Sequence, residues 1–249
     1  ECRDSWGIRM LESTLRHLDF SRRQIQKTKS VTLMVVLTLA LGIGVNTAIF
    51  SLASSFLFAP LDFPQFEQLV TLDERTDQLE SMSISYQNFL DWKERQNSFS
   101  AIGVWKNEGY NLAGTEGIER ISGSIVSYDL FQALQLTPII GRIFTEEDDQ
   151  PGAALTVIMS EPFWRSHFAG DPSILGTTLR LTDEPYTVIG VVPSLSPLDS
   201  GNLWSPIAPV AERFNMQNRG SHSLQGIARL KEGVSIEQAR SELNAIASH

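Results

Sequence analysis

The pattern of hydrophobic and polar positions divides the chain at one place. Residues 31–61 carry no charged side chain, and no comparable run occurs elsewhere in the sequence. A helix of about 20 mainly apolar residues is enough to cross a bilayer core, and this run is longer. The pattern predicts a transmembrane helix over residues 31–60, preceded by a short segment over 1–30 and followed by a large domain over 61–249.

A cleaved signal peptide is the alternative interpretation of this run. Residues 53–55, Ala-Ser-Ser, could serve as a small-residue cleavage site. A signal peptide, however, has an apolar core of about 7 to 15 residues behind a short basic head. Here the apolar run is about twice that length and the preceding segment has thirty residues, which favours a retained membrane anchor.

The segment before the span shows helical spacing of its own. Apolar side chains recur at Leu11, Leu15, Leu18 and Ile25, and arginines lie between them. This spacing is typical of a basic amphipathic helix on the cytoplasmic face of a membrane. An ordinary helix that continues into the span fits the pattern equally well.

After the span, short apolar runs alternate with stretches of helical periodicity. The runs predict strands at residues 68–73, 101–105, 118–126, 155–159, 177–181, 186–192 and 224–230. Helices are predicted at 85–96, at 128–135, after Ser160-Glu-Pro162 and after Ser235. We therefore expect a mixed α+β region in two subdomains, without internal repeats and without a further transmembrane helix.

Two serines are placed to cap these helices. Ser127 precedes the predicted helix at 128–135, and Ser235 is followed three residues later by Gln238, which forms a capping box. The residues between the strands at 177–181 and 186–192, Thr-Asp-Glu-Pro, predict a hairpin turn.

Charge gives the chain a direction across the membrane. Residues 1–30 contain seven Lys or Arg against four acidic residues, whereas residues 62–249 contain thirteen against twenty-five. Positive charge accumulates on the cytoplasmic side of membrane helices. We expect a plasma (inner) membrane protein with a cytoplasmic N-terminus and residues 61–249 in the periplasm or outside the cell. The acidic outer region also argues against nucleic-acid binding.

The residues that commonly carry chemistry are sparse and scattered. Cys2 is the single cysteine, so no disulfide can form within the chain. The four histidines show no metal-ligand spacing, and the acidic run at 146–149 lacks the spacing of a calcium loop, so it is interpreted as a solvated loop. No nucleophile elbow or phosphate-binding glycine loop occurs. The sequence predicts no catalytic residue, no cofactor and no metal.

Aromatic residues of the outer region have two interpretations. Four tryptophans and four tyrosines could line a groove for an apolar or peptide ligand. Core packing is the more common role of such residues, and it is the interpretation that we favour. The tryptophans are Trp92, Trp105, Trp164 and Trp204, and the tyrosines are Tyr86, Tyr110, Tyr128 and Tyr186.

Within the span, Ala40, Gly44 and Ala48 recur every four residues and place three small side chains on one helical face. Such a face lets another helix approach closely. Asn46 and Thr47 are costly to expose to lipid, so they also favour a neighbouring helix. We predict that Ala40, Gly44, Ala48 and Asn46 take part in helix packing. The alternative is that small residues are simply frequent in membrane helices.

Several sequence blocks carry a family resemblance. Residues 37–51 of the span are similar to the first transmembrane helix of ABC-transporter permeases of the MacB and FtsX type, especially the duplicated orphan-permease subgroup. The blocks that resemble the MacB-like periplasmic core domain of these permeases lie, in order, at residues 85–92, 141–148, 163–172, 186–193 and 227–235.

The sequence departs from the family pattern at two turns and in its length. Gln135 stands where the subgroup commonly has glycine, and Asp183-Glu184 stand where an Asn-Gly pair is typical. The family has further transmembrane helices after the periplasmic domain, so the chain resembles an N-terminal fragment.

The resemblance implies a permease subunit without enzymatic activity of its own. ATP would be bound only by a separate cytoplasmic ABC ATPase, whose hydrolysis would move the membrane helices and drive the outer domain by mechanotransmission, for export or for handling a periplasmic client. The expected partners are the lipid bilayer, other permease helices or a second permease copy, and this ATPase. The alternatives are a membrane-tethered binding module without transport activity and a nonfunctional truncated remnant.

Overall fold

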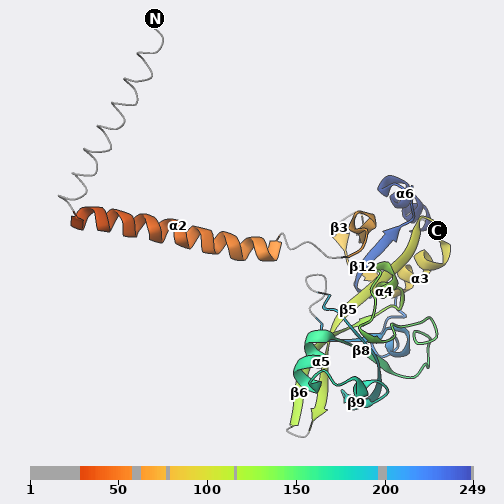
Figure 1. Ribbon diagram of the computed structural model, residues 1–249. Helices are drawn as coiled ribbons and strands as arrows, with labels where there is room; N and C mark the ends of the chain where they lie inside the picture. Colours follow the sequence, from red (N-terminus) through yellow and green to blue (C-terminus); the bar gives the residue numbers. More distant parts are fainter. Residues whose placement is uncertain (1–28, 58–62, 77–78, 115–116, 196–200, 248–249) are drawn as a thin grey trace, which may run out of the picture. The chain divides into compact units, whose positions relative to one another are not determined.

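The computed structural model in Figure 1 describes residues 29–57, 63–76, 79–114, 117–195 and 201–247, with only the backbone described at 52–57, 76, 79 and 80. The chain forms two compact units, residues 1–60 and residues 61–249. Each unit is described by itself, with the element labels of Figure 1.

The first unit contains the helix α2 (Lys29–Leu57). Its first part, Lys29–Ser51, is long and apolar enough to cross a membrane. At about 1.5 Å per residue this part alone exceeds the roughly 30 Å of a bilayer core. The expected helix is therefore present from residue 31 to residue 57. The predicted amphipathic helix over residues 10–25 lies outside the described residues.

The second unit is built on one mixed sheet whose strands follow the order β1-β12-β5-β6-β11-β8-β10-β7. β4 pairs with β12, and β9 pairs with β10 and β5. The strands are β1 (Leu69–Leu72), β4 (Ile84–Ser85), β5 (Phe99–Gly114), β6 (Gly117–Val126), β7 (Ile140–Gly141), β8 (Thr156–Ser160), β9 (Thr178–Leu181), β10 (Glu184–Val192), β11 (Leu203–Pro206) and β12 (His222–Leu230). β2 (Glu74–Thr76) and β3 (Leu79–Met82) form a separate hairpin.

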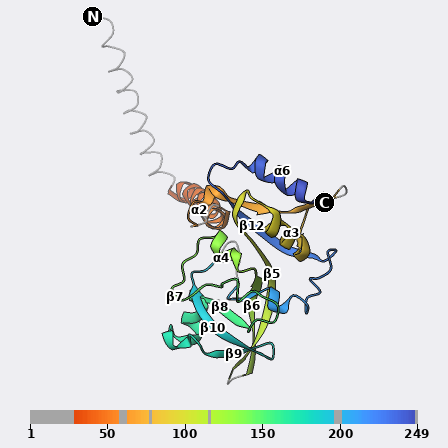
Figure 2. The ribbon, with the colours of Figure 1, turned by 90° about the vertical axis from the view of Figure 1, so that its right-hand side faces the viewer.

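Short helices connect and cover these strands. They are η1 (Phe66–Gln68), α3 (Tyr86–Arg95), α4 (Asp129–Ala133), α5 (Glu161–Phe168), η2 (Pro172–Ile174), η3 (Ala208–Val210) and α6 (Ile236–Ala247). Figure 2 shows α3 and α6 beside β12, with β8, β9 and β10 at the other end of the sheet. Strands and helices are thus interleaved, and the predicted α+β class is confirmed.

The helix starts follow from local capping. The hydroxyl of Ser160 accepts a hydrogen bond from Phe163 N at 3.3 Å. At α6, Ser235 Oγ accepts from Gln238 N at 3.2 Å and Gln238 Oε1 accepts from Ser235 N at 2.9 Å, which is the reciprocal pattern of a capping box. The sequence predicts both caps because each joins residues three positions apart in the chain.

The predicted cap at Ser127 is wrong. Its hydroxyl accepts a hydrogen bond from Val104 N at 3.0 Å, across to β5, and α4 begins at Asp129 without a side-chain cap. A buried strand amide needs an acceptor as much as a helix start does. The serine satisfies the strand because β5 lies next to it in space.

The central hairpin β5–β6 is longer than predicted. β5 extends nine residues beyond the expected end at 105, and its pairing with β6 runs from Trp105↔Val126 to Gly114↔Gly117. Asn107, Gly109 and Asn111 have low strand propensity, so this half of β5 does not look like a strand in isolation. Pairing with β6 over ten residue pairs overrides that preference.

The hydrophobic core of the second unit consists of three clusters. One lies among α3, α6 and strands β1, β4 and β12, a second among α5, β8, β9 and β10, and a third around α4, Trp105 and Trp204. All four outer tryptophans are buried. The core interpretation of the aromatic residues is therefore confirmed for these four, although Trp92 also lines a groove described below, while the expected division into two subdomains stays a prediction.

Candidate functional site

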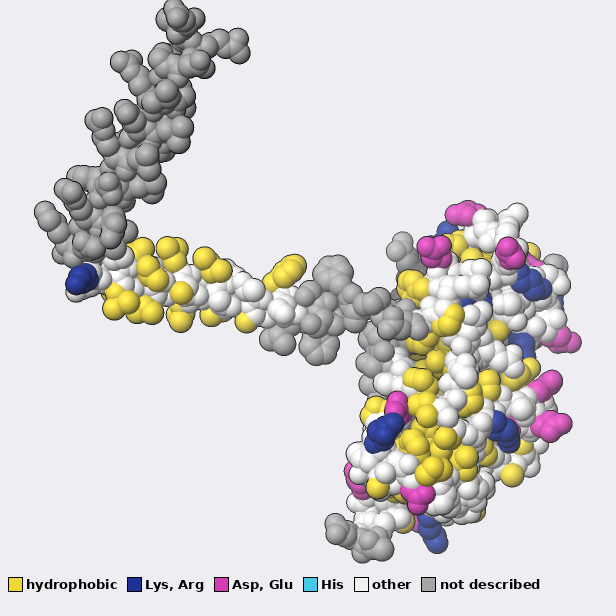
Figure 3. Space-filling view, viewed as in Figure 1, with side chains coloured by type: hydrophobic (Ala, Val, Ile, Leu, Met, Phe, Trp, Pro, Cys, Tyr) yellow, Lys and Arg dark blue, Asp and Glu magenta, His cyan; other side chains and the backbone are white. Residues whose placement is uncertain are grey.

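The face of α2 that carries Ala40, Gly44 and Ala48 is exposed along the described part of the helix. Nothing lies within 4 Å of the position that a Cβ at Gly44 would take. Figure 3 shows hydrophobic side chains along this helix, whereas charged side chains are distributed over the surface of the second unit. The helix thus presents a lipid-compatible surface on which the small face is open to a neighbour.

Helix geometry separates Asn46 from the small face. At about 100° per residue, Ala40, Gly44 and Ala48 fall within about 80° of one another, whereas Asn46 lies about 200° from Gly44. No hydrogen bond joins the Asn46 side chain to another described residue. The four predicted packing residues therefore occupy two sides of α2, and their role in packing stays a prediction.

Thr47 does not support the packing argument. Its hydroxyl donates to Ile43 O at 2.8 Å within the helix, and Thr38 donates in the same way to Met34 O at 3.0 Å. Threonine can satisfy its hydroxyl on the preceding turn of a helix. Thr47 can therefore face lipid without a neighbouring helix.

In the second unit, a partly buried ion pair joins α3 to α4. Lys93 Nζ lies 2.5 Å from Asp129 Oδ2 and 3.9 Å from the centre of the Tyr128 ring. Burial raises the pKa of Asp129 although Lys93 opposes the shift. Burial alone would lower the pKa of Lys93, but its contacts with Asp129 and Tyr128 together outweigh burial and raise the pKa. The ion pair therefore connects α3 to α4.

Asp149 forms a second part of this junction. Its carboxylate accepts hydrogen bonds from Ala208 N at 2.7 Å and from Tyr128 N at 3.0 Å. Burial raises its pKa, although both donors oppose the shift. One side chain thereby holds the start of η3 and the start of α4 together.

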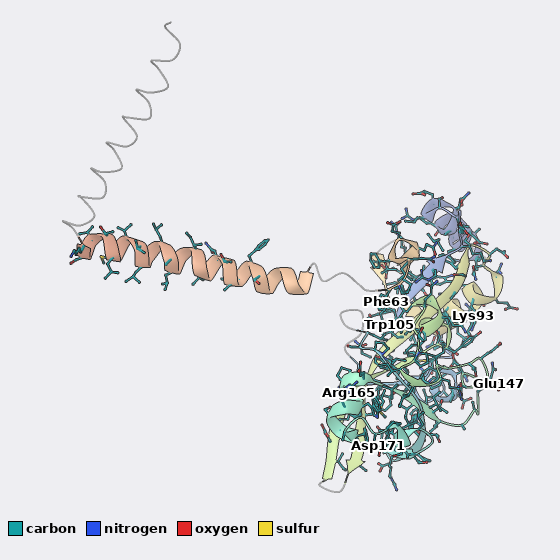
Figure 4. The ribbon with its side chains drawn as sticks, in the orientation of Figure 1. Phe63, Lys93, Trp105, Glu147, Arg165 and Asp171 are labelled. Atoms are coloured by element: carbon teal, nitrogen blue, oxygen red, sulfur yellow. The ribbon has the colours of Figure 1, made fainter. Side chains whose placement is uncertain are left out.

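The interpretation of residues 146–149 as a solvated loop is wrong for its second half. Glu146 is exposed, and so is Glu147, which is labelled in Figure 4, but Asp148 is buried. Arg142 donates to both carboxylate oxygens of Asp148, at 2.9 Å through Nη2, and Thr145 donates through its amide at 2.8 Å. Burial alone would raise the pKa of Asp148, but these donors outweigh it and lower the pKa. In the acidic run, the first two residues are therefore solvated, and the last two, Asp148 and Asp149, are hydrogen-bonded parts of the folded domain.

Arg229 on β12 is the buried cation of this unit that sequence reasoning missed. Its side chain donates to Ala133 O at the end of α4, at 2.7 Å, and to Gln65 O, at 3.0 Å. Gln65 lies 164 positions earlier in the sequence. The alternation of β12 placed Arg229 in a strand, but no local signal indicates a partner so distant.

A groove of about 580 Å³ lies beside β1, between α3 and α6. Apolar side chains such as Trp92, Phe99 and Leu243 share its walls with Asp73 and Arg240. Within the described residues, no group of three or more His, Cys, Asp or Glu side chains is placed to hold a metal ion. The groove offers a concave shape and walls of mixed polarity, which make it a candidate ligand-binding site.

Comparison with known proteins gives a single family. The family model described as "MacB-like periplasmic core domain" matches residues 32–246. No curated protein sequence matches the chain.

Three solved structures share the fold. The periplasmic region of MacB from Actinobacillus actinomycetemcomitans has a TM-score of 0.54 at 18% identity, with 72% of this chain and 82% of that chain covered. A domain of a protein described as a permease, from Porphyromonas gingivalis, has a TM-score of 0.60 at 18% identity, with 75% and 86% covered. The extracellular domain of the noncanonic ABC-type transporter YknZ from Gram-positive bacteria has a TM-score of 0.50 at 16% identity, with 70% and 88% covered. At these identities the likeness shows the fold alone.

Proposed function

This chain belongs to the family of the MacB-like periplasmic core domain, and from that premise we propose that it is a non-enzymatic permease subunit of an ABC-type transporter. Its second unit is the extracytoplasmic domain, and α2 is the first helix of a membrane bundle. A separate cytoplasmic ATPase supplies the energy. The single observation that carries the proposal is the family match, which spans both α2 and the folded domain.

The proposed mechanism is mechanotransmission. ATP binding and hydrolysis on the partner subunit shift the membrane helices, and α2 passes the shift to the domain that follows it in the chain. The domain then binds, pushes or releases a periplasmic client. The features that support this are a continuous helix up to Leu57 and a domain whose elements are joined by a partly buried ion pair and by hydrogen bonds.

The test begins with purification of the chain from its native membranes after mild crosslinking. We expect an ABC ATPase to copurify, and we expect ATP with vanadate to change amide hydrogen exchange in residues 63–72 relative to the nucleotide-free complex. The variant Gly44→Leu should reduce copurification, whereas Val45→Leu, which lies on another side of α2, should not. Loss of all nucleotide response, together with the absence of an ATPase after crosslinking, would contradict the proposal.

The groove beside β1 favours a second candidate, a membrane-tethered binding module that works without ATP. Under this candidate a client would alter exchange in α3 and α6, and nucleotide would alter nothing. The same experiment therefore separates the two functions, because the permease requires a nucleotide response and the tethered module excludes one.

A further inference from the structure

Residues 63–68, which we call the lead-in segment, are the first described residues of the domain and the part that follows α2 in the chain. Gln65 in this segment has a left-handed backbone, with φ of 50°. Phe63 packs against the cluster that contains Trp105 (Figure 4). The lead-in segment ends where β1 begins, at Leu69.

Arg229 is bound to the lead-in segment from inside the domain. Arg229 as a residue is 3% exposed, and it lies on β12, where it is the register partner of Leu69. One guanidinium nitrogen donates to Gln65 O and another to Ala133 O. Arg229 thus connects the lead-in segment, β12 and the end of α4 through a single side chain.

This arrangement is costly for stability alone. Both acceptors are neutral carbonyl groups, and among the described residues Nη2 has no hydrogen-bond partner and Arg229 forms no ion pair. Burial lowers the pKa of Arg229, which reflects the cost of keeping the charge away from water. A methionine of similar length would fill the space without that cost. The presence of a guanidinium at this position is therefore better explained by the two segments that it connects, which carry the carbonyl groups of Gln65 and Ala133.

β1 needs such a support if the chain before it is displaced. β1 has four residues and stands at the end of the strand order, where it pairs with β12. A displacement that arrives through the lead-in segment loads the Leu69 end of this antiparallel pair. The pairs Leu69↔Arg229, Val70↔Ala228, Thr71↔Ile227 and Leu72↔Gly226 would then open one after another.

We propose that Arg229 is a positioning residue for transmission: it clamps the lead-in segment to β12 and α4, so that a displacement of α2 moves the domain as a body instead of peeling β1 from the sheet. The clamp itself does not depend on the proposed permease function. Its use in transmission rests on that function.

The test uses the full chain in lipid nanodiscs without nucleotide, followed by hydrogen exchange and mass spectrometry. In the unmodified protein, the β1 amides that are hydrogen-bonded to β12 should exchange as slowly as those of central β12, although β1 is an edge strand. Arg229→Met should accelerate exchange in residues 66–72 by about tenfold or more, because local opening no longer breaks the clamp. Arg229→Lys keeps the charge but cannot donate to two carbonyls in fork geometry, so it should show a smaller acceleration in the same residues.

Arg180→Met, at an exposed position of strand β9, is the matched control and should leave exchange in residues 66–72 unchanged. Fast exchange of β1 in the unmodified protein overturns the clamp, and so does an acceleration that is equal in β8, β10 and β1. With the ATPase partner present, nucleotide should change exchange in residues 63–72 and in α6 together in the unmodified protein. In Arg229→Lys the change in residues 63–72 should occur without the change in α6. If the clamp is found but no nucleotide response exists in any variant, the proposed permease function fails and the clamp stands.

Discussion

Gln135, just after α4, has a left-handed backbone with φ of 53°, at the position where the family resemblance leads one to expect glycine. A residue with a Cβ pays about 1 kcal/mol or more for this conformation, whereas glycine adopts it freely. Gln135→Gly should therefore raise the free energy of unfolding by about 0.5 to 1 kcal/mol. Denaturant unfolding of the full chain in detergent, followed by tryptophan fluorescence, measures the change.

The matched control for this prediction is Gln132→Gly. Gln132 is exposed and lies inside α4, where its backbone is helical. Glycine there should lower the free energy of unfolding by about 0.5 to 1 kcal/mol. If both variants shift stability in the same direction, the backbone strain assigned to Gln135 is wrong.

Asp148 gives a prediction with a pH signature. Its pKa is lowered in the folded state, so its carboxylate stabilises the fold above its ordinary pKa of about 3.9 and that contribution is lost as the pH falls through the folded value. Asp148→Asn should lower stability by about 1 to 3 kcal/mol at pH 7, because it removes charge-assisted hydrogen bonds. The difference from the unmodified protein should shrink below about pH 4.

Thermal unfolding between pH 3 and pH 7 checks this behaviour, with Glu147→Gln as the control. Glu147 is exposed, and neutralising it should change little across the range. A destabilisation by Asp148→Asn that persists unchanged at pH 3 would show that the lost charge is not the cause.

Single residues were predictable where their partners are near in sequence. Ser160 and Gln238 act three positions away, and the sequence identified both. Ser127 was misjudged because its partner Val104 lies on a paired strand, and Arg229 was missed because Gln65 is distant in the chain. The chemistry of a side chain determines which kinds of group it can bind. It does not determine which of the many such groups in the chain will lie next to it.

At the scale of elements, α2 carries a prediction about neighbours. The small face and Asn46 lie about 200° apart, so one neighbouring helix cannot contact both. A photocrosslinker at Leu37, seven residues before Gly44, should capture one helix, and one at Leu39, seven residues before Asn46, should capture another. Gly44→Leu should abolish only the first product. Asn46→Leu should weaken only the second contact, by roughly 1 to 2 kcal/mol if an interhelical hydrogen bond is lost.

Val45→Leu is the control for both products, since position 45 lies between the two faces and the change conserves apolar character. Identical crosslinked products from Leu37 and Leu39, or equal sensitivity of the products to Gly44→Leu and Val45→Leu, would contradict the prediction. The small residues would then have no specific role in helix packing.

Elements were predictable in proportion to the strength of their local pattern. The span is recognisable from the length of its uncharged run, and α3 and α6 from their helical periodicity; the structure places all three within a few residues of the expected bounds. The second half of β5 and the short strand β11 depend on pairing partners: β11 joins β6 in parallel, far along the chain. These segments form strands because they pair with neighbouring strands, whereas the intrinsic strand propensity of their own residues is weak.

At the scale of the whole molecule, composition and order of elements were enough for the fold class but not for the sheet. The strand order brings β12 between β1 and β5, and it makes β8 and β10 parallel neighbours although β9 intervenes in sequence. Such pairings follow from how the three clusters of the core close together. The hydrophobic pattern within a single strand does not indicate which other strand it will pair with.

The charge asymmetry of the chain leads to a prediction about its orientation. The basic segment 1–30 should stay in the cytoplasm, and the acidic domain should lie outside. Cys2 is the single native cysteine, and the Asp183 side chain on the second unit is 93% exposed, so Asp183→Cys adds one well-exposed reporter there. In spheroplasts, a membrane-impermeant maleimide should label position 183 and leave Cys2 unlabelled. In inverted vesicles the pattern should reverse, and detergent should make both positions reactive. Labelling of Cys2 in spheroplasts would place the N-terminus outside, and no cytoplasmic ATPase could then act on the chain from that side through residues 1–30.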